Sequence, residues 1–165
     1  MQSYTVQFLV DAPPARVWRT LHPRVPDDAP SPRIIEYSGG RIEALVEGDE
    51  AGQGLVRTCE FGVPKFLLSR GRARSWECVP EARLHEFARY RAVGKPLWSD
   101  AEGWHRLEEQ PNGSTLLTFH ETYHARNPVM RWLVEKRVHQ FISRHNEATY
   151  EMVLAYAGRT TKLTT

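Results

Sequence analysis

Apolar side chains at spacings of three and four residues mark the last third of the chain as a long helix. Asn127 is a favoured N-cap residue, Pro128 suits the first helical position, and Gly158 is typical of the position just past a helix. Between them, one face carries a continuous stripe: Met130, Val134, Val138, Phe141, His145, Ala148, Met152 and Tyr156. A stripe of this length needs a long partner, and we predict that a sheet supplies it.

Alternating apolar and polar positions upstream of this helix predict the strands of that sheet. The alternation is clear around Tyr4, Val6 and Phe8, and again over the two arms of a hairpin, residues 104–109 and 115–124. Further strand-like runs cover residues 34–37, 41–47, 55–61, 72–79 and 84–93. We therefore predict an α+β fold in which a curved antiparallel sheet wraps around the long C-terminal helix.

Short segments complete the predicted architecture. Short helices are expected after the first strand, the first of them opened by Pro13 and Pro14, and an irregular proline-containing connector spans residues 22–33. No internal repeat or linker divides the chain. We predict a single domain over residues 1–158, followed by a C-terminal tail over residues 159–165.

The turn sequence Pro111-Asn112-Gly113-Ser114 predicts a register for the final hairpin. With Asn112-Gly113 as a two-residue loop, the facing pairs are Arg106 with Phe119, His105 with His120, and Trp104 with Glu121. One side of the hairpin then carries the bulkier aromatic side chains, and we place it against the helix: Trp104, Arg106, Leu117, Phe119, Glu121 and Tyr123.

Composition narrows the classes of function. A formal net charge of +2 over 165 residues gives no electrostatic support to nucleic-acid binding. Two cysteines without a zinc-type spacing of cysteine and histidine predict no disulfide framework, no metal site and no cofactor. No apolar run is long enough to span a bilayer, and residues 1–10 lack the pattern of a signal peptide, so we expect a cytoplasmic protein.

Three stretches of the chain resemble a known fold family. Residues 10–18, Val-Asp-Ala-Pro-Pro-Ala-Arg-Val-Trp, look like its strand-to-helix opening. Residues 52–57, Gly-Gln-Gly-Leu-Val-Arg, look like the glycine-bounded entry of a central strand, and residues 104–121 look like its final hairpin. Together with the long C-terminal helix they resemble the START-like helix-grip superfamily (SRPBCC domains), which includes Bet v 1-like proteins and polyketide cyclase/dehydrase-type domains.

The resemblance implies a deep apolar cavity between sheet and helix that holds a lipid, polyketide or aromatic molecule. Some members of the superfamily are enzymes, and others carry or sense a ligand. The cysteine/histidine pattern of the Rieske oxygenases is missing from this chain. The lining that we expect combines strand and helix residues: Arg57, Trp76, Phe87, Trp104, Arg106, Phe119, Glu121, Tyr123, Phe141, His145 and Met152.

Glu121 and His145 are the candidate catalytic residues. A carboxyl held between aromatic neighbours has a raised pKa and suits acid/base catalysis or the binding of a polar ligand group. The alternative for Glu121 is a structural ion pair with Arg106. His145 lies in the middle of the helix stripe, where it would either contact a ligand in the cavity or be a satisfied core histidine.

Other features leave alternatives open. Facing His105 and His120 suggest a surface ladder rather than a metal site, because a third ligand is not near. Two apolar loops, residues 63–68 and 93–98, would border the mouth of the cavity, touch a membrane surface or simply close the core.

The function and the oligomeric state also stay open. Trp132 and Tyr150, on the helix face opposite the stripe, suggest either a homodimer contact or two separate contacts within a monomer. Three functions remain: a carrier or sensor of a hydrophobic small molecule, a cyclase- or dehydratase-like enzyme that uses Glu121 and His145 as acid and base, and a protein-interaction module with a filled core.

Overall fold

The computed structural model describes residues 1–22, 33–37, 40–62, 65, 71–94 and 99–163. The strands in these residues are β1 (Gln2–Val10), β2 (Arg33–Tyr37), β3 (Gly40–Val46), β4 (Val56–Gly62), β5 (Arg72–Arg83), β6 (Phe87–Gly94), β7 (Ser99–Glu109), β8 (Thr115–Ala125) and β9 (Thr160–Leu163). The helices are α1 (Pro14–Leu21), α2 (Pro128–Leu133) and α3 (Glu135–Leu154).

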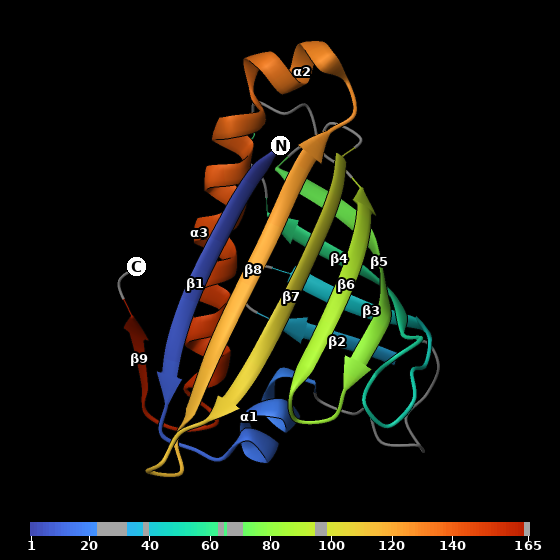
Figure 1. Ribbon diagram of the computed structural model, residues 1–165. Helices are drawn as coiled ribbons and strands as arrows, with labels where there is room; N and C mark the ends of the chain where they lie inside the picture. Colours follow the sequence, from blue (N-terminus) through green and yellow to red (C-terminus); the bar gives the residue numbers. More distant parts are fainter. Residues whose placement is uncertain (23–32, 38–39, 63–64, 66–70, 95–98, 164–165) are drawn as a thin grey trace.

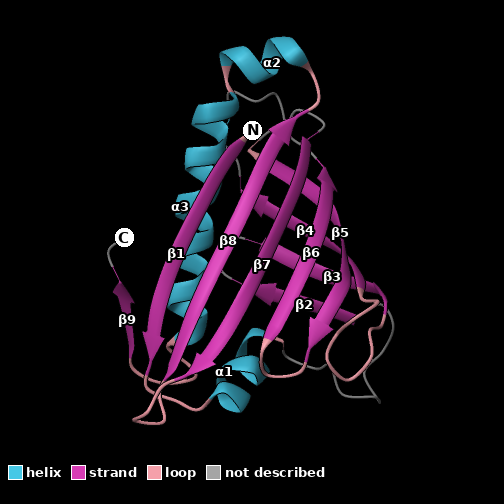
Figure 2. Ribbon diagram, in the orientation of Figure 1, coloured by secondary structure: helices cyan, strands magenta, loops and turns pink. Residues whose placement is uncertain are grey.

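The described strands form one antiparallel sheet in the order β2-β3-β4-β5-β6-β7-β8-β1-β9. The sheet curves around α3, as Figure 1 shows, and α1 and α2 lie at opposite ends of the molecule (Figure 2). This arrangement confirms the predicted α+β fold with a curved sheet around a long helix. The segment after Gly158, predicted as a tail, instead contains β9, which pairs with β1 at the edge of the sheet.

The long predicted helix is divided at Val134. Asn127 caps α2 as predicted, because its side chain accepts hydrogen bonds from the amides of Val129 and Met130. Val134 then leaves the helical conformation, with φ −134° and ψ −13°, and α3 begins at the next residue. The buried residues of α3 are Glu135, Val138, His139, Ser143 and Leu154, so its inward face is rotated relative to the predicted stripe.

The final hairpin has a longer loop than predicted. Glu109 is the last residue of β7 to pair, and its partner is Thr115, which shifts every facing pair by one residue. Gly113 has φ +80°, and its amide donates to the carbonyl of Gln110 at 2.8 Å. This geometry is typical of a three-residue loop in which glycine takes the left-handed position. The predicted two-residue loop is therefore wrong.

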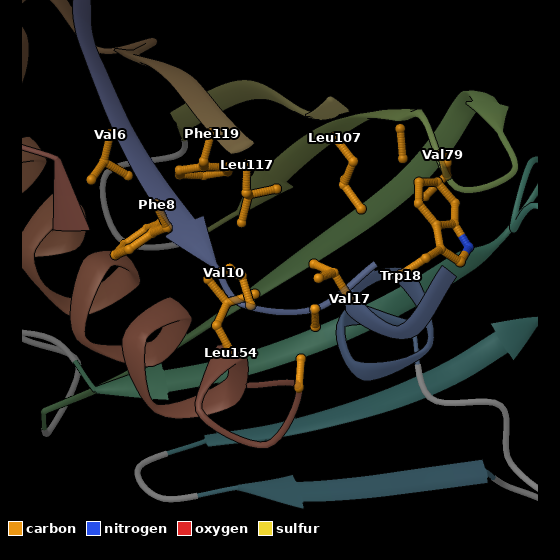
Figure 3. Close-up of a cluster of buried hydrophobic side chains, with 13 residues drawn as sticks. Val6, Phe8, Val10, Val17, Trp18, Val79, Leu107, Leu117, Phe119 and Leu154 are labelled. Carbon is orange, nitrogen blue, oxygen red and sulfur yellow. The ribbon is translucent and has the colours of Figure 1, made fainter. Parts of the chain in front are cut away.

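The hydrophobic core lies where α1 and the end of α3 meet the sheet. Figure 3 shows Phe8 and Val10 of β1, Val17 of α1 and Leu154 of α3 converging there. These four side chains are completely buried. They belong to one cluster with Val6, Ala12, Trp18, Val79, Ala88, Leu107, Leu117, Phe119 and Ala157. Burial of its apolar face thus holds α1, the short helix that follows β1, against the sheet.

The sequence pattern indicates a turn at residues 80–83, between the predicted strands 72–79 and 84–93, and this placement is wrong. The turn between β5 and β6 lies at residues 84–86 and not at residues 80–83, which continue β5 after a bulge. The two apolar loops, residues 63–68 and 93–98, lie mostly outside the described residues.

Candidate functional site

A cavity of about 1350 Å³ lies between the concave face of the sheet and α3. Its wall comes from β3 to β8, from one side of α3 and from the end of α1. Protein interiors are normally close-packed, but here many of the inward side chains are too small to fill the space between the sheet and α3. The small lining residues of β4 to β7 and α3 include Cys59, Ser75, Ala88, Ala92, Gly94, Ser99, Ala101 and Thr149.

Residues of three neighbouring strands position Glu121 in this wall. Gly103 on β7 pairs with Tyr90 on β6 and with Glu121 on β8, so the three lie side by side across the sheet. Because Gly103 has no side chain, the Tyr90 ring lies over it, where an added Cβ would be 2.4 Å from ring atoms. The Tyr90 hydroxyl thereby reaches Glu121 and donates a hydrogen bond to its Oε2.

The Glu121 carboxyl is buried and only partly satisfied. The side chain is 4% exposed, and Asn146 of α3 donates from Nδ2 to Oε2 at 3.1 Å. Oε1 has no hydrogen-bond partner among the described residues. Burial raises the pKa of Glu121 to about 7, although the hydrogen bonds from Tyr90 and Asn146 oppose the rise. Near neutral pH the carboxyl is therefore present in both protonation states, which suits proton transfer.

His145 precedes Asn146 on α3 and also lines the cavity. Its Nε2 atom is buried and has no hydrogen-bond partner within the described part of the chain. Buried polar atoms without a partner are rare in folded proteins. Two of those found in the described residues, Nε2 of His145 and Oε1 of Glu121, belong to side chains that line the cavity, so a bound molecule would be able to complete their hydrogen bonding.

A second polar cluster lies on β4 and β5. Arg57 and Glu77 are cross-strand partners, and the Arg57 Nε donates to Oε2 of Glu77 at 2.9 Å. Ser75 donates to the other oxygen at 3.2 Å. Burial alone lowers the pKa of Arg57, but the Glu77 carboxylate outweighs burial and the net shift is upward. Burial also raises the pKa of the Cys59 thiol. This cluster is thus a matched ion pair beside a protonated thiol.

Two histidines meet where α1 reaches the cavity. The Nε2 atoms of His22 and His105 are 2.9 Å apart, so one ring donates a hydrogen bond to the other. Trp18 stacks on His22 with ring centroids 4.3 Å apart. Burial, together with the nearby charge of Arg57, lowers the pKa of His105 to about 4. Burial likewise lowers the pKa of His22. Both rings are therefore neutral at neutral pH.

Aromatic side chains contribute the apolar part of the wall on the helix side. The Tyr150 ring packs on Phe119, with centroids 4.6 Å apart, and stacks on Phe8 at 6.3 Å. Tyr150 lines the cavity, so its predicted position on the outer face of the helix is wrong. Trp132 is exposed as predicted.

The structure separates the predicted lining residues into two groups. The residues that lie in the cavity wall are Arg57, Phe119, Glu121, Tyr123 and His145. The residues that lie outside it are Trp76, Phe87, Trp104, Arg106, Phe141 and Met152. The predicted placement of the second group is wrong, for three separate reasons.

The hairpin register accounts for Trp104 and Arg106. In the observed register Trp104 pairs with His120, and the two rings stack with centroids 5.4 Å apart on the outer face. The Arg106 guanidinium lies 5.7 Å from the Trp104 ring. Arg106 therefore forms no ion pair with Glu121, and the proposed pairing of these two residues is also wrong. His105 pairs with Phe119, so its predicted pairing with His120 is wrong too.

Strand alternation accounts for two more residues, and helix rotation accounts for the last two. Trp76 lies between two cavity-lining positions of β5, so it points to the outer face and is 41% exposed. Phe87 is buried, but its ring packs near Trp104 outside the cavity. Phe141 and Met152 lie beside the inward face of α3 and are 38% and 37% exposed.

Sequence reasoning missed several polar residues of the wall, among them Tyr90, Asn146 and Glu77. One signal was present: Gly103 interrupts a strand, and a strand glycine often marks the close approach of a neighbouring group. That group is the Tyr90 ring. Asn146 gave no signal, because a polar residue on a helix is normally assigned to the solvent side.

The described residues contain neither a metal-binding cluster nor a membrane-spanning helix. Within the described ranges, His, Cys, Asp and Glu side chains do not come together in groups of three or more that could hold a metal ion. The helices of the described residues are not long and apolar enough to cross a membrane.

The fold, in contrast to the sequence, has clear counterparts. The chain matches no protein-family model and no curated protein. It is similar to the crystal structure of Ara h 8.0201, with a TM-score of 0.62 and 15% identity over 94% of this chain and 97% of that one. It is equally similar to the Zhui aromatase/cyclase from a Streptomyces species, with a TM-score of 0.62 and 17% identity over 94% and 92%.

A third similar structure is DynU16, a putative protein in the dynemicin biosynthetic locus. Its TM-score is 0.50 at 14% identity, over 89% of this chain and 48% of that one. These similarities establish that the protein has the helix-grip fold of START-like and Bet v 1-like proteins, which confirms the resemblance noted in the sequence. At such low identity they establish the fold alone.

Proposed function

We propose that this helix-grip protein binds a hydrophobic small molecule, of lipid, polyketide or aromatic type, between its sheet and α3, and acts as a carrier or sensor. The cavity volume supports this proposal, because ligand pockets typically measure roughly 300–1,000 Å³ and the present one is larger, at about 1350 Å³. Its mixture of aromatic and small side chains suits an apolar ligand body.

The observation that carries the proposal is the unsatisfied polar pair in the wall, Glu121 Oε1 and His145 Nε2. A buried polar atom without a partner costs roughly 1–3 kcal/mol. A ligand hydroxyl or phenol that bonds to Glu121 would remove part of this cost. We therefore expect a ligand that is mainly apolar and carries at least one hydrogen-bonding group.

Native mass spectrometry of the purified protein, before and after denaturation, tests whether a small molecule is bound. Its expected result is the release of a hydrophobic molecule on unfolding. A panel of lipids, polyketides and aromatic compounds, assayed by thermal shift, extends the test to protein purified without ligand. No released molecule and no shift from any compound would refute the proposal.

A matched pair of tryptophan substitutions locates the binding site. Ala92 lines the cavity, whereas its neighbour Val93 lies on the outer face of β6 and is 45% exposed. Ala92→Trp places a large ring in the cavity and should abolish binding, while Val93→Trp adds the same ring outside and should leave binding intact. Equal affinities for both variants would place the ligand elsewhere.

A cyclase- or dehydratase-like enzyme is the second candidate. The observation in its favour is the pKa of Glu121, about 7, which keeps both the acid and the base form available near neutral pH. His145 lines the same cavity and would supply the partner group. In this role the protein would convert a linear poly-β-ketone into a cyclised product with loss of water. Glu121→Gln should then abolish turnover but retain binding, as followed by mass spectrometry of the products.

A protein-interaction module with a filled core is the third function that the sequence leaves open. A filled core is the feature that would favour it, and the cavity between the sheet and α3 gives it no support.

A further inference from the structure

α2 exposes a large amount of apolar side chain for its length. None of its six residues is buried. Trp132 is 84% exposed, and the other exposed apolar residues of the helix are Val129, Met130 and Leu133. Single exposed apolar residues are normal on protein surfaces, but a contiguous group marks an interaction surface. We call this group the α2 apolar patch.

The patch is exposed because of how the chain is built around α2. Asn127 starts the helix just beyond the end of β8, and the break at Val134 ends it before α3 turns back along the sheet. α2 therefore lies at the end of the molecule opposite α1, as Figure 1 shows. In this position neither the sheet nor the core covers its apolar side chains.

The exposed charged residues next to the patch, on α2 and the first turn of α3, are basic. Arg131, Lys136 and Arg137 are exposed, and none of them forms an ion pair with a described acidic residue. The acid between them, Glu135, is buried and accepts a hydrogen bond from the Ala125 amide at 2.8 Å. The Arg131 Nε donates to the Ala125 carbonyl at 3.0 Å. The outer surface at this end is therefore apolar with a positive rim.

This combination of side chains is typical of a membrane-surface contact. Interfacial helices place Trp and Leu between the lipid headgroups and present Lys and Arg to anionic lipid. A contact with another protein would account for Trp132 and the arginines, which are types enriched in protein interfaces, but less well for Lys136, because lysine is depleted there. An anionic bilayer complements both the apolar and the basic part of the surface.

We propose that α2 and the first turn of α3 dock on the surface of an anionic lipid bilayer. Trp132 and Leu133 enter the headgroup region, and Arg131, Lys136 and Arg137 contact lipid phosphates. The contact is peripheral and does not involve the cavity wall, since none of these five residues belongs to it. The inference is thus independent of whether the cavity holds a ligand.

Co-sedimentation of the full chain with vesicles tests the inference. Vesicles of phosphatidylcholine alone are compared with equal mixtures of phosphatidylcholine and phosphatidylglycerol. We expect binding to the mixed vesicles only, and weaker binding as salt is added, because salt screens the attraction to the headgroups. Trp132→Ser/Leu133→Ser and Lys136→Glu/Arg137→Glu should each lower the partition coefficient by roughly tenfold or more.

Matched controls are available at the other end of the molecule. Tyr156→Ser removes an aromatic side chain that is 78% exposed after α3, and Arg16→Glu/Arg19→Glu reverses two exposed charges on α1. Both controls should bind vesicles like the wild type. Because all the substituted side chains are exposed, circular dichroism should report an unchanged fold for every variant.

Three results would overturn the inference. The first is equal binding to neutral and anionic vesicles, and the second is an equal loss of binding in the Arg16→Glu/Arg19→Glu control. The third is a dimer, seen by analytical ultracentrifugation, that Trp132→Ser dissociates while vesicle binding is absent. That last result would assign the α2 apolar patch to self-association.

Discussion

Replacing Glu121 with glutamine is expected to change how the stability of the protein depends on pH. A glutamine carbonyl oxygen can accept the two hydrogen bonds that Oε2 of Glu121 receives from Tyr90 and Asn146. The substitution therefore retains the shape and hydrogen bonding of the site and removes only its ionisation. The difference between the two proteins isolates the cost of charging this buried carboxyl.

The magnitude follows from the pKa of Glu121, which burial raises from 4.5 to about 7. A carboxyl with a higher pKa in the folded state holds its proton more tightly there than in the unfolded chain. The free energy of unfolding therefore falls as the pH rises from the unfolded to the folded pKa, and is constant above it. At about 1.36 kcal/mol per pKa unit, the wild type loses roughly 3 kcal/mol over this range. Glu121→Gln has no corresponding loss.

Urea unfolding followed by tryptophan fluorescence measures this difference. The free energy of unfolding of each protein is determined at about pH 4 and about pH 8, and the variant should gain roughly 3 kcal/mol relative to the wild type at the higher pH. His22 and His105 also have shifted pKa values, but both proteins contain them, so their contribution cancels. The exposed Glu109, replaced by glutamine, serves as the control and should show no such gain.

One result would refute the reasoning. If the stability difference between Glu121→Gln and the wild type is the same at both pH values, the carboxyl is not desolvated in the folded protein. The proposed acid/base role, which depends on a pKa near neutrality, would lose its support at the same time.

Three further predictions concern the residues that build the site and its surroundings. Gly103→Ala should lower the free energy of unfolding by roughly 1–3 kcal/mol in urea, since its Cβ would lie 2.4 Å from the Tyr90 ring. Gly62→Ala, whose Cβ meets nothing within 4 Å, is the control, and equal losses would contradict the argument. Asn127→Ala removes the N-cap of α2. It should speed amide hydrogen exchange in α2 by roughly fivefold and leave exchange in α3 unchanged. Unchanged exchange in α2 would show that the cap does not stabilise the helix. An NMR titration of His105 should give a pKa of about 4, and a value near 6.5 would show that the imidazole is solvated.

Strand β8 shows what local pattern could predict about the site. Its residues alternate strictly between buried and partly exposed positions, and Phe119, Glu121 and Tyr123 lie on the buried face as predicted. The cap at Asn127 was equally readable, because a cap depends only on the amides of the next residues. Both features arise from residues that are close together in the chain.

Strand β7 shows where local pattern failed. The loop of the hairpin holds one residue more than the two-residue turn that Asn112-Gly113 suggests, and this exchanges the two faces of β7 relative to β8. His105 consequently lies in the cavity wall, Gly103 lies under the Tyr90 ring, and Trp104 faces outward. A shift of one residue reverses every side chain of a strand, so a small error in the loop became a large error in the site.

The prediction of the inward face of α3 failed for a different reason. A hydrophobic stripe predicts the buried face only when that face packs against a core. Here the inward face lines a cavity and is partly polar, with His145, Asn146 and Thr149 in the wall. Apolar residues beside it, such as Phe141 and Met152, are only partly covered, at 38% and 37% exposed. The stripe therefore pointed to the flank of the true inward face.

The sequence by itself determined the order of the elements from β1 to β8, the curved sheet around a long helix, and the burial of Glu121. These features follow from alternation, capping and helix periodicity, which act between near neighbours along the chain. Only the tertiary structure decided that the Tyr90 hydroxyl reaches Glu121 across Gly103 and that Asn146 donates a second hydrogen bond to the same carboxyl. It also decided that a cavity remains between the sheet and α3. Those outcomes depend on the register of strands and the rotation of a helix, and both are set by packing between residues that are far apart in sequence.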